Sequence, residues 1–459
     1  MKWFLSFNFH RILFVLFLFI LISVPFGTKK FIYSFGDLID EFRAIFLYGS
    51  DILLILFLGL AIAYYKKQAT FDVKKILSLL KEKIYFQILI IFLIFCGFSI
   101  FFADYKILAF YQFIRLTFLI LSVLVIVDLF KKGLIKFQFF VAVFAISSFF
   151  QALVAILQFK FFRSLGLWFL GEPVVDVFTP NVAWFRIGDL IFLRSFGTLP
   201  HANILAAFLI LGLISFYYLW IKSFSKNGSK FIFRVFLTIG LFFVFLALLF
   251  TFSRSGWLVA AIVSSLFLIL VFLNKDYRKA SFSLLIVIFV CCWLIISNFD
   301  WLFLPRAQFS ATEPSVNYRW LYNKIGLEVI RENILGVGIG NQLFYAVNNN
   351  LYQKFGIFHQ KDWQPIHNIY LLIASEIGVF GLLFFGLFVV FLIFENLKRW
   401  QKKEIKIEVL TAVMMLISLL LFSLVDHFSW TLQSGRLMFW LASSLVLGTS
   451  LVNNSLKSS

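Results

Sequence analysis

The chain has 459 residues, of which 62% are hydrophobic and 14% are charged, and its mean hydropathy is +0.97. Soluble domains carry about 25% charged residues, so this composition excludes a soluble globular protein. The 41 Lys and Arg residues against 22 Asp and Glu give a formal net charge of +19. We interpret this charge as a membrane topology signal and an attraction to anionic lipid, with no nucleic-acid partner.

Apolar runs of about 20 residues, the length that crosses the hydrocarbon core of a bilayer, recur from end to end. The runs are continuous rather than alternating, which excludes a membrane β-barrel. The sequence therefore predicts an all-α polytopic membrane protein with about 12 transmembrane helices, the first retained because no small-residue cleavage site follows it. The expected spans lie near residues 12–26, 51–65, 84–103, 107–129, 137–159, 202–221, 235–252, 256–273, 281–299, 367–394, 407–425 and 432–451.

Short basic segments separate alternate spans. By the positive-inside rule these segments are cytoplasmic, so the N-terminus is expected inside and the segments 160–201 and 300–366 outside. This pattern predicts localisation to the cytoplasmic (inner) membrane. The basic clusters lie within residues 66–83, 131–136, 222–234, 275–279 and 398–406.

Charged residues, Asn, Gln, Pro and Gly return between residues 300 and 366, which indicates a water-exposed subdomain on the external face. This change in composition divides the chain into four parts. They are N-terminal transmembrane helices (1–159), central helices with arginine motifs (160–299), an external loop subdomain (300–366) and C-terminal transmembrane helices (367–459).

The external segment contains one predicted amphipathic helix. Leu321, Ile325 and Val329 are spaced by four residues, which places them on one buried face. On another face, Lys324 and Glu328 have the spacing of an ion pair.

A glycine run should end this helix. Gly336, Gly338 and Gly340 permit a turn that other residues resist. A Gly-x-Gly-x-Gly stretch can also bind phosphate, but this one follows a helix instead of preceding one, so the helix dipole does not favour an anion there. The spacing favours a structural turn.

Three arginines are candidates for anion binding. Arg254 lies in the tight hairpin TFSRSGWL between two spans, where it either snorkels to the lipid headgroups or faces inward and holds an anion. Arg194 lies near the end of the outer segment, in RSFGTLPHANILAAF. Arg319, near the start of the external helix, is either a solvated surface charge or a further anion contact.

His367 and Asn368 open the apolar run that follows the external subdomain. An imidazole with an ordinary pKa of about 6.5 suits proton transfer near neutral pH. In the alternative interpretation, Asn368 caps a helix and His367 is an interface residue. Asp426 and His427, in the link before the last span, could line the same vestibule, but an interface role is favoured for them.

The three cysteines give no sign of a disulfide or a metal site. Cys96, Cys291 and Cys292 all lie inside expected spans and lack the spacing of metal ligands. The sequence therefore predicts neither a metal nor another cofactor.

Four segments occur in the order found in the bacterial O-antigen ligase and polymerase superfamily: RSFGTLPHANILA, TFSRSGWL, YRWLYNKIGLEVIRENILGVGIGN and HNIYLLIASEIGVFG. The chain resembles this family from about residue 190 to residue 390. Arg254 with Leu258 resembles the family's arginine followed four positions later by leucine. Arg194 matches the arginine before the family's Gly-Thr segment, although Asn203 comes one residue later than in the usual form.

The most specific part of the resemblance is the histidine signature. His367 and Asn368, followed by Gly378 and Gly381, resemble the family's histidine–amide–glycine pattern at the same spacing. The resemblance implies a membrane-embedded glycosyltransferase of the GT-C type. Such an enzyme moves a glycan from a polyprenyl (undecaprenyl) diphosphate donor to an acceptor hydroxyl on the outer face of the membrane, with inversion and without a metal.

The resemblance also implies roles for the candidate residues. Arg194 and Arg254 would bind the donor diphosphate, since a guanidinium offers planar, always-charged donors to phosphate oxygens. His367 would be the catalytic base, with Arg319 and Asn368 in secondary roles. The acceptor would be lipid-, glycan- or protein-linked.

Other functions remain open. A polysaccharide flippase or transporter should show repeated halves and charges in the midplane of its spans, but the chain has no evident internal repeat and few such charges, Arg115 being the clearest. A membrane scaffold would not require arginines and a histidine at one depth. Within the superfamily, the full spacing of the histidine signature favours a ligase over a polymerase.

Overall fold

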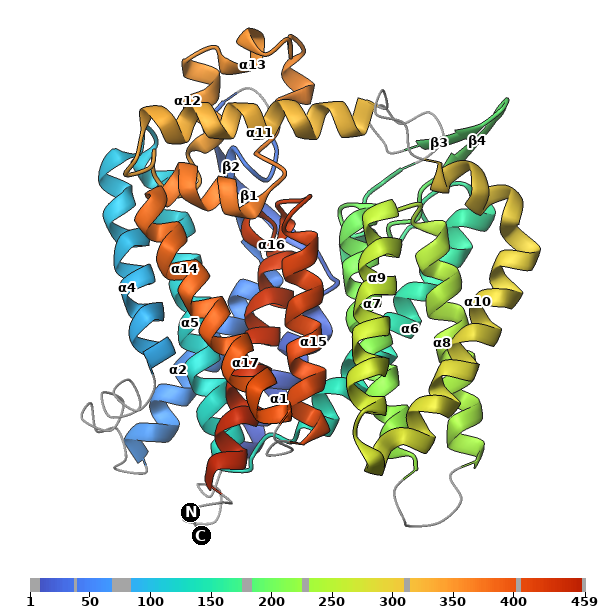
Figure 1. Cartoon of the computed structure of the whole chain (residues 1–459). Coiled ribbons are helices and arrows are strands. Elements are labelled where there is room, and N and C mark those ends of the chain that lie inside the picture. Colours follow the sequence, from blue (N-terminus) through green and yellow to red (C-terminus); the bar gives the residue numbers. More distant parts are fainter. Residues whose placement is uncertain are drawn as a thin grey trace.

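The computed structural model describes residues 9–36, 39–67, 84–175, 184–224, 231–308, 314–401 and 406–455. Long helices run side by side, and a layer of short helices and hairpins covers one end of them (Figure 1). Three of the predicted cytoplasmic basic clusters lie partly outside the described residues, at 68–83, 225–230 and 402–405.

Within the described residues, nine helices are long and apolar enough to cross a membrane, and each coincides with a predicted span. The protein is therefore a polytopic membrane protein. The other three predicted spans fall on two shorter apolar helices, α1 (Phe9–Ser23) and α15 (Ile407–Phe422), and on α17 (Gln433–Ser455). The nine are α2 (Gly49–Lys67), α4 (Ile84–Phe98) with η1 (Ser99–Phe102), α5 (Lys106–Lys131), α6 (Phe137–Phe161), α7 (Ala202–Lys222), α8 (Phe231–Phe250), α9 (Arg254–Phe272), α10 (Arg278–Ala307) and α14 (Ile369–Gln401).

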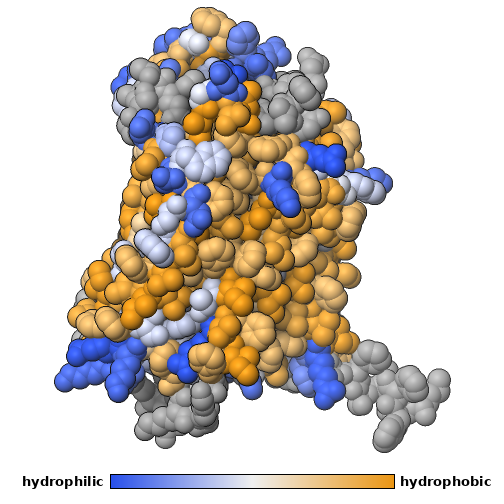
Figure 2. All heavy atoms as spheres, turned by 90° about the vertical axis from the view of Figure 1, so that its right-hand side faces the viewer, coloured by the Kyte–Doolittle hydropathy of each residue, from blue (hydrophilic) through white to orange (hydrophobic). Residues whose placement is uncertain are grey.

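The outward faces of the long helices are apolar. On α8 and α10, Phe236, Phe289 and Trp293 are 66%, 67% and 58% exposed. Figure 2 shows hydrophobic side chains across the middle of the molecule and hydrophilic ones gathered toward the two ends. Burying each such ring is worth about 1.5–3 kcal/mol, so this surface fits hydrocarbon rather than water.

The helices form two groups, α6 to α10 on one side and α1, α2, α4, α5 and α14 to α17 on the other (Figure 1). The helix α15 packs against both α7 and α9, so it connects the two groups. Nearly all of α7 is buried, because it also packs against α6 and α8. Gly212 lets α7 approach α6, since a Cβ there would lie 2.0 Å from the Ser148 hydroxyl.

The layer at one end of the long helices corresponds to the subdomain predicted to be external, and we call it the external layer. It contains α11 (Pro314–Glu332), α12 (Gln342–Asn348), α13 (Leu351–Lys354) and η4 (Gln360–Asp362). Figure 1 shows α11 lying across the ends of the long helices. The predicted buried face is confirmed: Ile325 and Val329 are 1% and 0% exposed, and Leu321 packs at the edge of the same cluster.

The predicted pair between Lys324 and Glu328 is wrong. The Glu328 carboxylate instead binds the Lys354 ammonium at 2.5 Å, because α13 packs close to α11 and supplies a nearer cation. The Lys324 ammonium lies over the Trp320 ring, 5.6 Å from its centroid.

Two short antiparallel hairpins were not predicted from sequence. The strand β1 (Lys29–Ser34) pairs with β2 (Ala44–Tyr48), and β3 (Trp184–Ile187) pairs with β4 (Leu190–Leu193). Each strand is short and borders an apolar span. Its alternation of apolar and polar residues therefore cannot be distinguished from the apolar run of that span. A further difference is that α10 continues to Ala307, beyond its expected end at 299, with non-helical backbone at Phe299.

The glycine run forms the predicted turn, and the turn packs against a kink in α14. Gly378 has φ 86°, which interrupts the helix. The N–H groups of Val337 and Gly338 donate to the carbonyl oxygens of Ser375 and Glu376, both at 2.9 Å. The kink leaves these carbonyls without helical partners, so the loop satisfies them.

Candidate functional site

His367 lies two residues before α14, at the junction between the long helices and the external layer. Its Nδ1 is 3.0 Å from the carbonyl oxygen of Pro365. A carbonyl oxygen can only accept, so Nδ1 carries the proton and Nε2 keeps its lone pair. The ring stacks on Tyr322 of α11 at 5.0 Å between centroids. The imidazole is therefore oriented, in the tautomer that a base requires.

Asn368 caps α14. Its Oδ1 accepts from the N–H groups of Tyr370 and Leu371 at 3.0 and 3.2 Å, and its Nδ2 donates to the carbonyl oxygen of Leu424 at 3.2 Å. These bonds satisfy the first turn of the helix and tie it to the end of α15. Asn368 thus fixes the backbone that carries His367.

Asp426 and His427 are buried beside His367, at 8% and 5% exposure. The sequence favours an interface role for them, but the link between α15 and α17 turns inward through the short helix α16 (Phe428–Thr431). The His427 ring meets the His367 ring edge to face at 4.6 Å. The His427 Nδ1 lies 2.7 Å from the hydroxyl of Thr431.

A hydrogen-bonded chain joins Arg194 to Asp426, which lies beside this histidine pair. Arg194 donates through Nη2 to the Oδ1 of Asn203 at 2.9 Å and through Nε to the carbonyl of Thr251 at 2.9 Å. Asn203 in turn donates through Nδ2 to the carboxylate of Asp426 at 2.8 Å. The local arrangement at Asn203 is set by His201, which caps α7 and accepts from the Asn203 N–H at 3.1 Å.

Burial and charge set the protonation states of the cluster. Burial, the His427 ring and the Arg319 guanidinium lower the pKa of His367 from 6.5 to about 3, against the opposite effect of Asp426. Burial acts to raise the pKa of Asp426, but His427, His367 and Arg319 outweigh it and hold that pKa below its usual range. At neutral pH, His367 is neutral and Asp426 is ionised.

The other two candidate arginines differ in their relation to the histidine pair. Arg319 on α11 is half-buried and close enough to affect both His367 and His427 electrostatically. Arg254 begins α9 and donates through Nη1 to the carbonyl oxygen of Gln308 at 3.1 Å. Its neighbour Ser253 donates to Asn203 Oδ1 at 2.9 Å, which links the α9 hairpin to the Arg194 chain.

Leu258, which matches the leucine of the family's motif, does not face this site. Leu258 is 62% exposed one turn beyond Arg254 and faces outward from α9. In the part of the chain that the structure describes, no three His, Cys, Asp or Glu side chains are grouped so as to hold a metal ion.

Sequence reasoning passed over Tyr322, Glu376 and Arg436. Glu376 and Arg436 are buried, at 4% and 6% exposure, close to the N-terminal ends of α14 and α17. A charge inside an apolar run was the available signal for both. Tyr322 gave no signal, because its contact with His367 depends on how α11 crosses the long helices.

The fold and this cluster define a polytopic membrane protein with a partly buried histidine–aspartate–arginine site at one end of its helices. Residues 239–386 match the family model described as O-Antigen ligase, so the chain carries an O-antigen ligase domain from α8 to α14. A search of curated proteins found no match. The domain makes this a membrane protein of polysaccharide biosynthesis, of the O-antigen ligase or polymerase type. Such proteins are glycan-transferring enzymes with lipid-linked glycan substrates.

Proposed function

We propose that this protein is an O-antigen ligase-like glycosyltransferase. It moves a glycan from a polyprenyl (undecaprenyl) diphosphate donor to an acceptor hydroxyl, on the outer face of the cytoplasmic membrane, with inversion and without a metal. The architecture is of the GT-C type, with α1, α15 and α17 completing twelve transmembrane helices. The observation that carries the proposal is the half-buried, neutral His367, whose Nδ1 is bound to Pro365 and which feels the charge of Asp426, the end of the chain from Arg194 through Asn203.

The reaction follows from that arrangement. The Nε2 lone pair of His367 takes the proton of the acceptor hydroxyl as its oxygen attacks the anomeric carbon of the donor sugar. The bond between that carbon and the diphosphate oxygen breaks on the opposite face, and the lipid diphosphate leaves with the electron pair. Attack opposite the leaving group inverts the anomeric configuration. Asp426 stabilises the imidazolium that forms.

Arginines stabilise the leaving group. A diphosphate gains negative charge as it departs, and guanidinium groups in a partly desolvated site stabilise that charge better than they would in water. Arg194 is held by Thr251 and Asn203, so its charge is fixed in position before the donor binds. Arg254 and Arg319 add two further cations around the same vestibule.

His367 provides the test of this mechanism. We expect His367→Ala to lower transfer by about two to four orders of magnitude, with lipid-linked donor still binding to the arginines. His367→Gln keeps a hydrogen-bonding side chain but not a base, so it should be as inactive as the alanine variant. The assay is glycan transfer in proteoliposomes with purified lipid-linked glycan. Near-wild-type turnover by the glutamine variant would remove the base role.

The orientation of the chain can be tested separately. A reporter fused near Asn349, in the external layer, should read outside, and fusions after Lys67, Lys132, Lys226 and Lys402 should read cytoplasmic. A cytoplasmic signal near Asn349 would contradict the mechanism, because the donor glycan is presented on the outer face.

The alternative within the superfamily is a polysaccharide polymerase. The spacing from His367 to Gly381 supports the ligase. A ligase transfers a finished glycan once, whereas a polymerase produces a ladder of longer lipid-linked glycans, so the product of the reconstituted reaction separates them. A flippase is the remoter alternative and would give no new glycosidic bond.

A further inference from the structure

The helix α11 lies across the ends of the long helices, so it runs along the membrane surface rather than through the membrane (Figure 1). One side of it is buried: Tyr322, Ile325 and Val329 are 4%, 1% and 0% exposed. The opposite side carries apolar residues that are exposed, with Trp320 at 61% and Leu327 at 55%. This exposed side therefore differs from an ordinary solvated helix face, which is polar.

Four exposed residues of α11 form a single stripe. Trp320, Lys324, Leu327 and Arg331 follow one another at steps of four and three residues, which keeps them on one side of a helix. The two cations thus alternate with the two apolar side chains. The Lys324 ammonium also lies over the Trp320 ring, 5.6 Å from its centroid. We call these four residues the lateral stripe.

The lateral stripe continues into the lipid-facing surface of the protein. Ile334 and Leu335, which follow the end of α11, are 60% and 43% exposed. The carbonyl oxygen of Ile334 accepts from the N–H of Val379 at 3.1 Å. Val379 and Phe380, on the membrane-spanning helix α14, are 40% and 50% exposed. Because Ile334 lies three residues after Arg331, an exposed apolar surface leads from a transmembrane helix onto α11.

The helix α4 and the turn η1 extend the same surface. The Phe380 ring stacks on Phe95 of α4 at 6.1 Å between centroids. Phe101, at 74% exposure, lies in η1, where the Ser99 hydroxyl accepts from the Ile339 N–H at 3.1 Å. Lipid-facing rings therefore reach the level at which the segment after α11 joins the long helices.

The charges of the lateral stripe favour an anionic partner. Both carboxylates of α11 have partners elsewhere in the external layer: Glu328 binds the Lys354 ammonium at 2.5 Å, and Glu332 accepts from a tyrosine hydroxyl of α12 at 3.0 Å. Among the residues that the structure describes, no carboxylate forms an ion pair with Lys324 or Arg331. Cations that alternate with apolar side chains along a helix match the anionic headgroups and acyl chains of a lipid surface.

We propose that the lateral stripe docks on the adjacent leaflet of the membrane and binds anionic phospholipid. Lys324 and Arg331 contact headgroup phosphates, and Trp320 and Leu327 lie at the boundary between headgroups and acyl chains. The helix α11 is thus an in-plane anchor for the external layer. The docking does not depend on the transferase function.

Cysteine labelling measures the docking. Leu327→Cys places a thiol in the lateral stripe, and Asn349→Cys places one after α12, above α11 in Figure 1. The full chain is reconstituted in nanodiscs of phosphatidylglycerol or phosphatidylcholine and treated with a membrane-impermeant maleimide. The rate for the unmodified chain, whose three cysteines lie in membrane spans, is subtracted.

The labelling rates should differ by position and by lipid. In phosphatidylglycerol, the Leu327→Cys chain should react about tenfold more slowly than the Asn349→Cys chain, because the membrane covers the lateral stripe. In phosphatidylcholine, which has no net charge, the Leu327→Cys chain should react faster than it does in phosphatidylglycerol. The Asn349→Cys chain should react equally in both.

Charge variants identify the lipid. Lys324→Gln and Arg331→Gln should each speed labelling of the Leu327→Cys chain in phosphatidylglycerol. In native mass spectrometry of the full chain, each should also weaken retention of phosphatidylglycerol about fivefold. Lys324→Arg and Arg331→Lys are the matched controls, because they keep the charge, and they should change neither measurement.

Equal labelling of the Leu327→Cys and Asn349→Cys chains in phosphatidylglycerol would overturn the proposal, because the lateral stripe would then lie in water. Equal protection in both lipids, unchanged by the glutamine variants, would overturn the role of the cations. Protection that appears only after undecaprenyl phosphate is added would assign the stripe to a polyprenyl lipid instead. Labelling requires no substrate, so the docking can fail or stand separately from glycan transfer.

Discussion

Two clusters of buried polar side chains lie near the external layer, and they differ in how completely they are paired. In the first, Gln158 donates to Glu172 at 2.7 Å and to the Gly197 carbonyl at 2.8 Å, and it accepts from the N–H groups of Phe196 and Gly197. In the second, beside the histidines, the Gln112 oxygen and the Arg436 Nη1 have no partner. We call these the anchor cluster and the pocket cluster.

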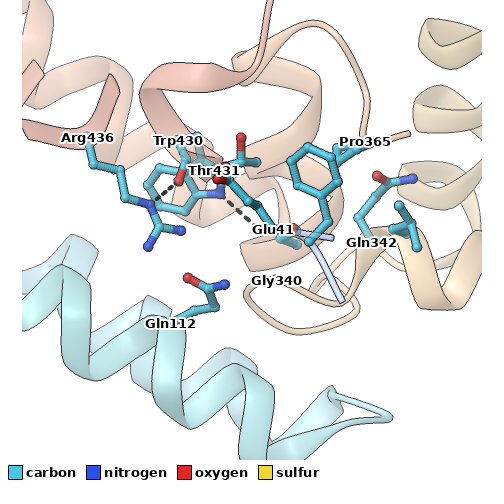
Figure 3. A pocket seen from close by; sticks show the side chains of 11 residues that line it. Glu41, Gln112, Gly340, Gln342, Pro365, Trp430, Thr431 and Arg436 are labelled. Carbon is cyan, nitrogen blue, oxygen red and sulfur yellow. Dashed lines mark hydrogen bonds between the residues drawn. The ribbon is translucent and has the colours of Figure 1, made fainter. Parts of the chain in front are cut away.

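The hydrogen bonds of the anchor cluster show its role. In the anchor cluster the carboxylate of Glu172 also accepts from the N–H groups of Leu165 and Leu167, at 2.7 and 2.6 Å. Such complete pairing within the chain holds the segment that carries Arg194 against α6. The pocket cluster, named for the small pocket that its side chains line (Figure 3), is paired less completely within the protein. Complete pairing thus gives the anchor cluster a structural role.

The largest expected effect breaks the anchor cluster. Gln158→Leu leaves the carbonyl of Gly197 and two N–H groups without partners, which should destabilise the protein by about 3 kcal/mol or more. Thermal unfolding in nanodiscs should show the loss, and transfer should fall because Arg194 moves. If Gln158→Leu were as stable as Gln112→Leu, the distinction between the clusters would fail.

The next effect lies at the arginines, which serve function and not stability. Arg194→Lys and Arg254→Lys keep the charge but lose the planar fork that engages two phosphate oxygens. Each should lower transfer by about 10²-fold with normal membrane insertion. The comparison is with Arg331→Lys, on the exposed part of the external layer, which should transfer normally. Unchanged transfer by both lysine variants would leave the diphosphate clamp without support.

The smallest effect concerns pH. His367 acts only when neutral, and its pKa is lowered from 6.5 to about 3, so transfer should stay constant as pH falls through 6.5 and decline only in much more acidic buffer. Arg319→Gln removes a cation that lowers this pKa and should move the decline about one unit toward neutral pH. Asp426→Asn removes an anion that raises it and should move the decline the other way. An inflection at 6.5 in the wild-type profile would show that the surroundings of His367 do not lower its pKa.

Sequence patterns predicted the membrane helices well because the signal is local. An apolar run of sufficient length must form a helix in a bilayer, since no water is available for unpaired backbone groups. The same locality predicted the external helix with Ile325 and Val329 inside, and the turn at its glycines. It did not predict the hairpins or the partner of Glu328, because both depend on segments brought together by the fold.

The candidate site divides in the same way. His367, Arg194 and Arg254 stand in short motifs at the ends of spans, so the sequence alone marked them. Only the tertiary structure joined Asn203 to Asp426, which lie 223 positions apart, and turned the α15–α17 link inward against His367.

The pocket cluster is the clearest case of a feature that the sequence does not predict. Gln112 and Arg436 lie in different helices, and nothing in either helix indicates that they face one space. The amphipathic pattern that reports burial in a soluble protein is absent here, because lipid-facing and buried positions are both apolar. Where two spans meet is set by packing and by the hydrogen bonds of their few polar residues, and that is decided only when the helices assemble.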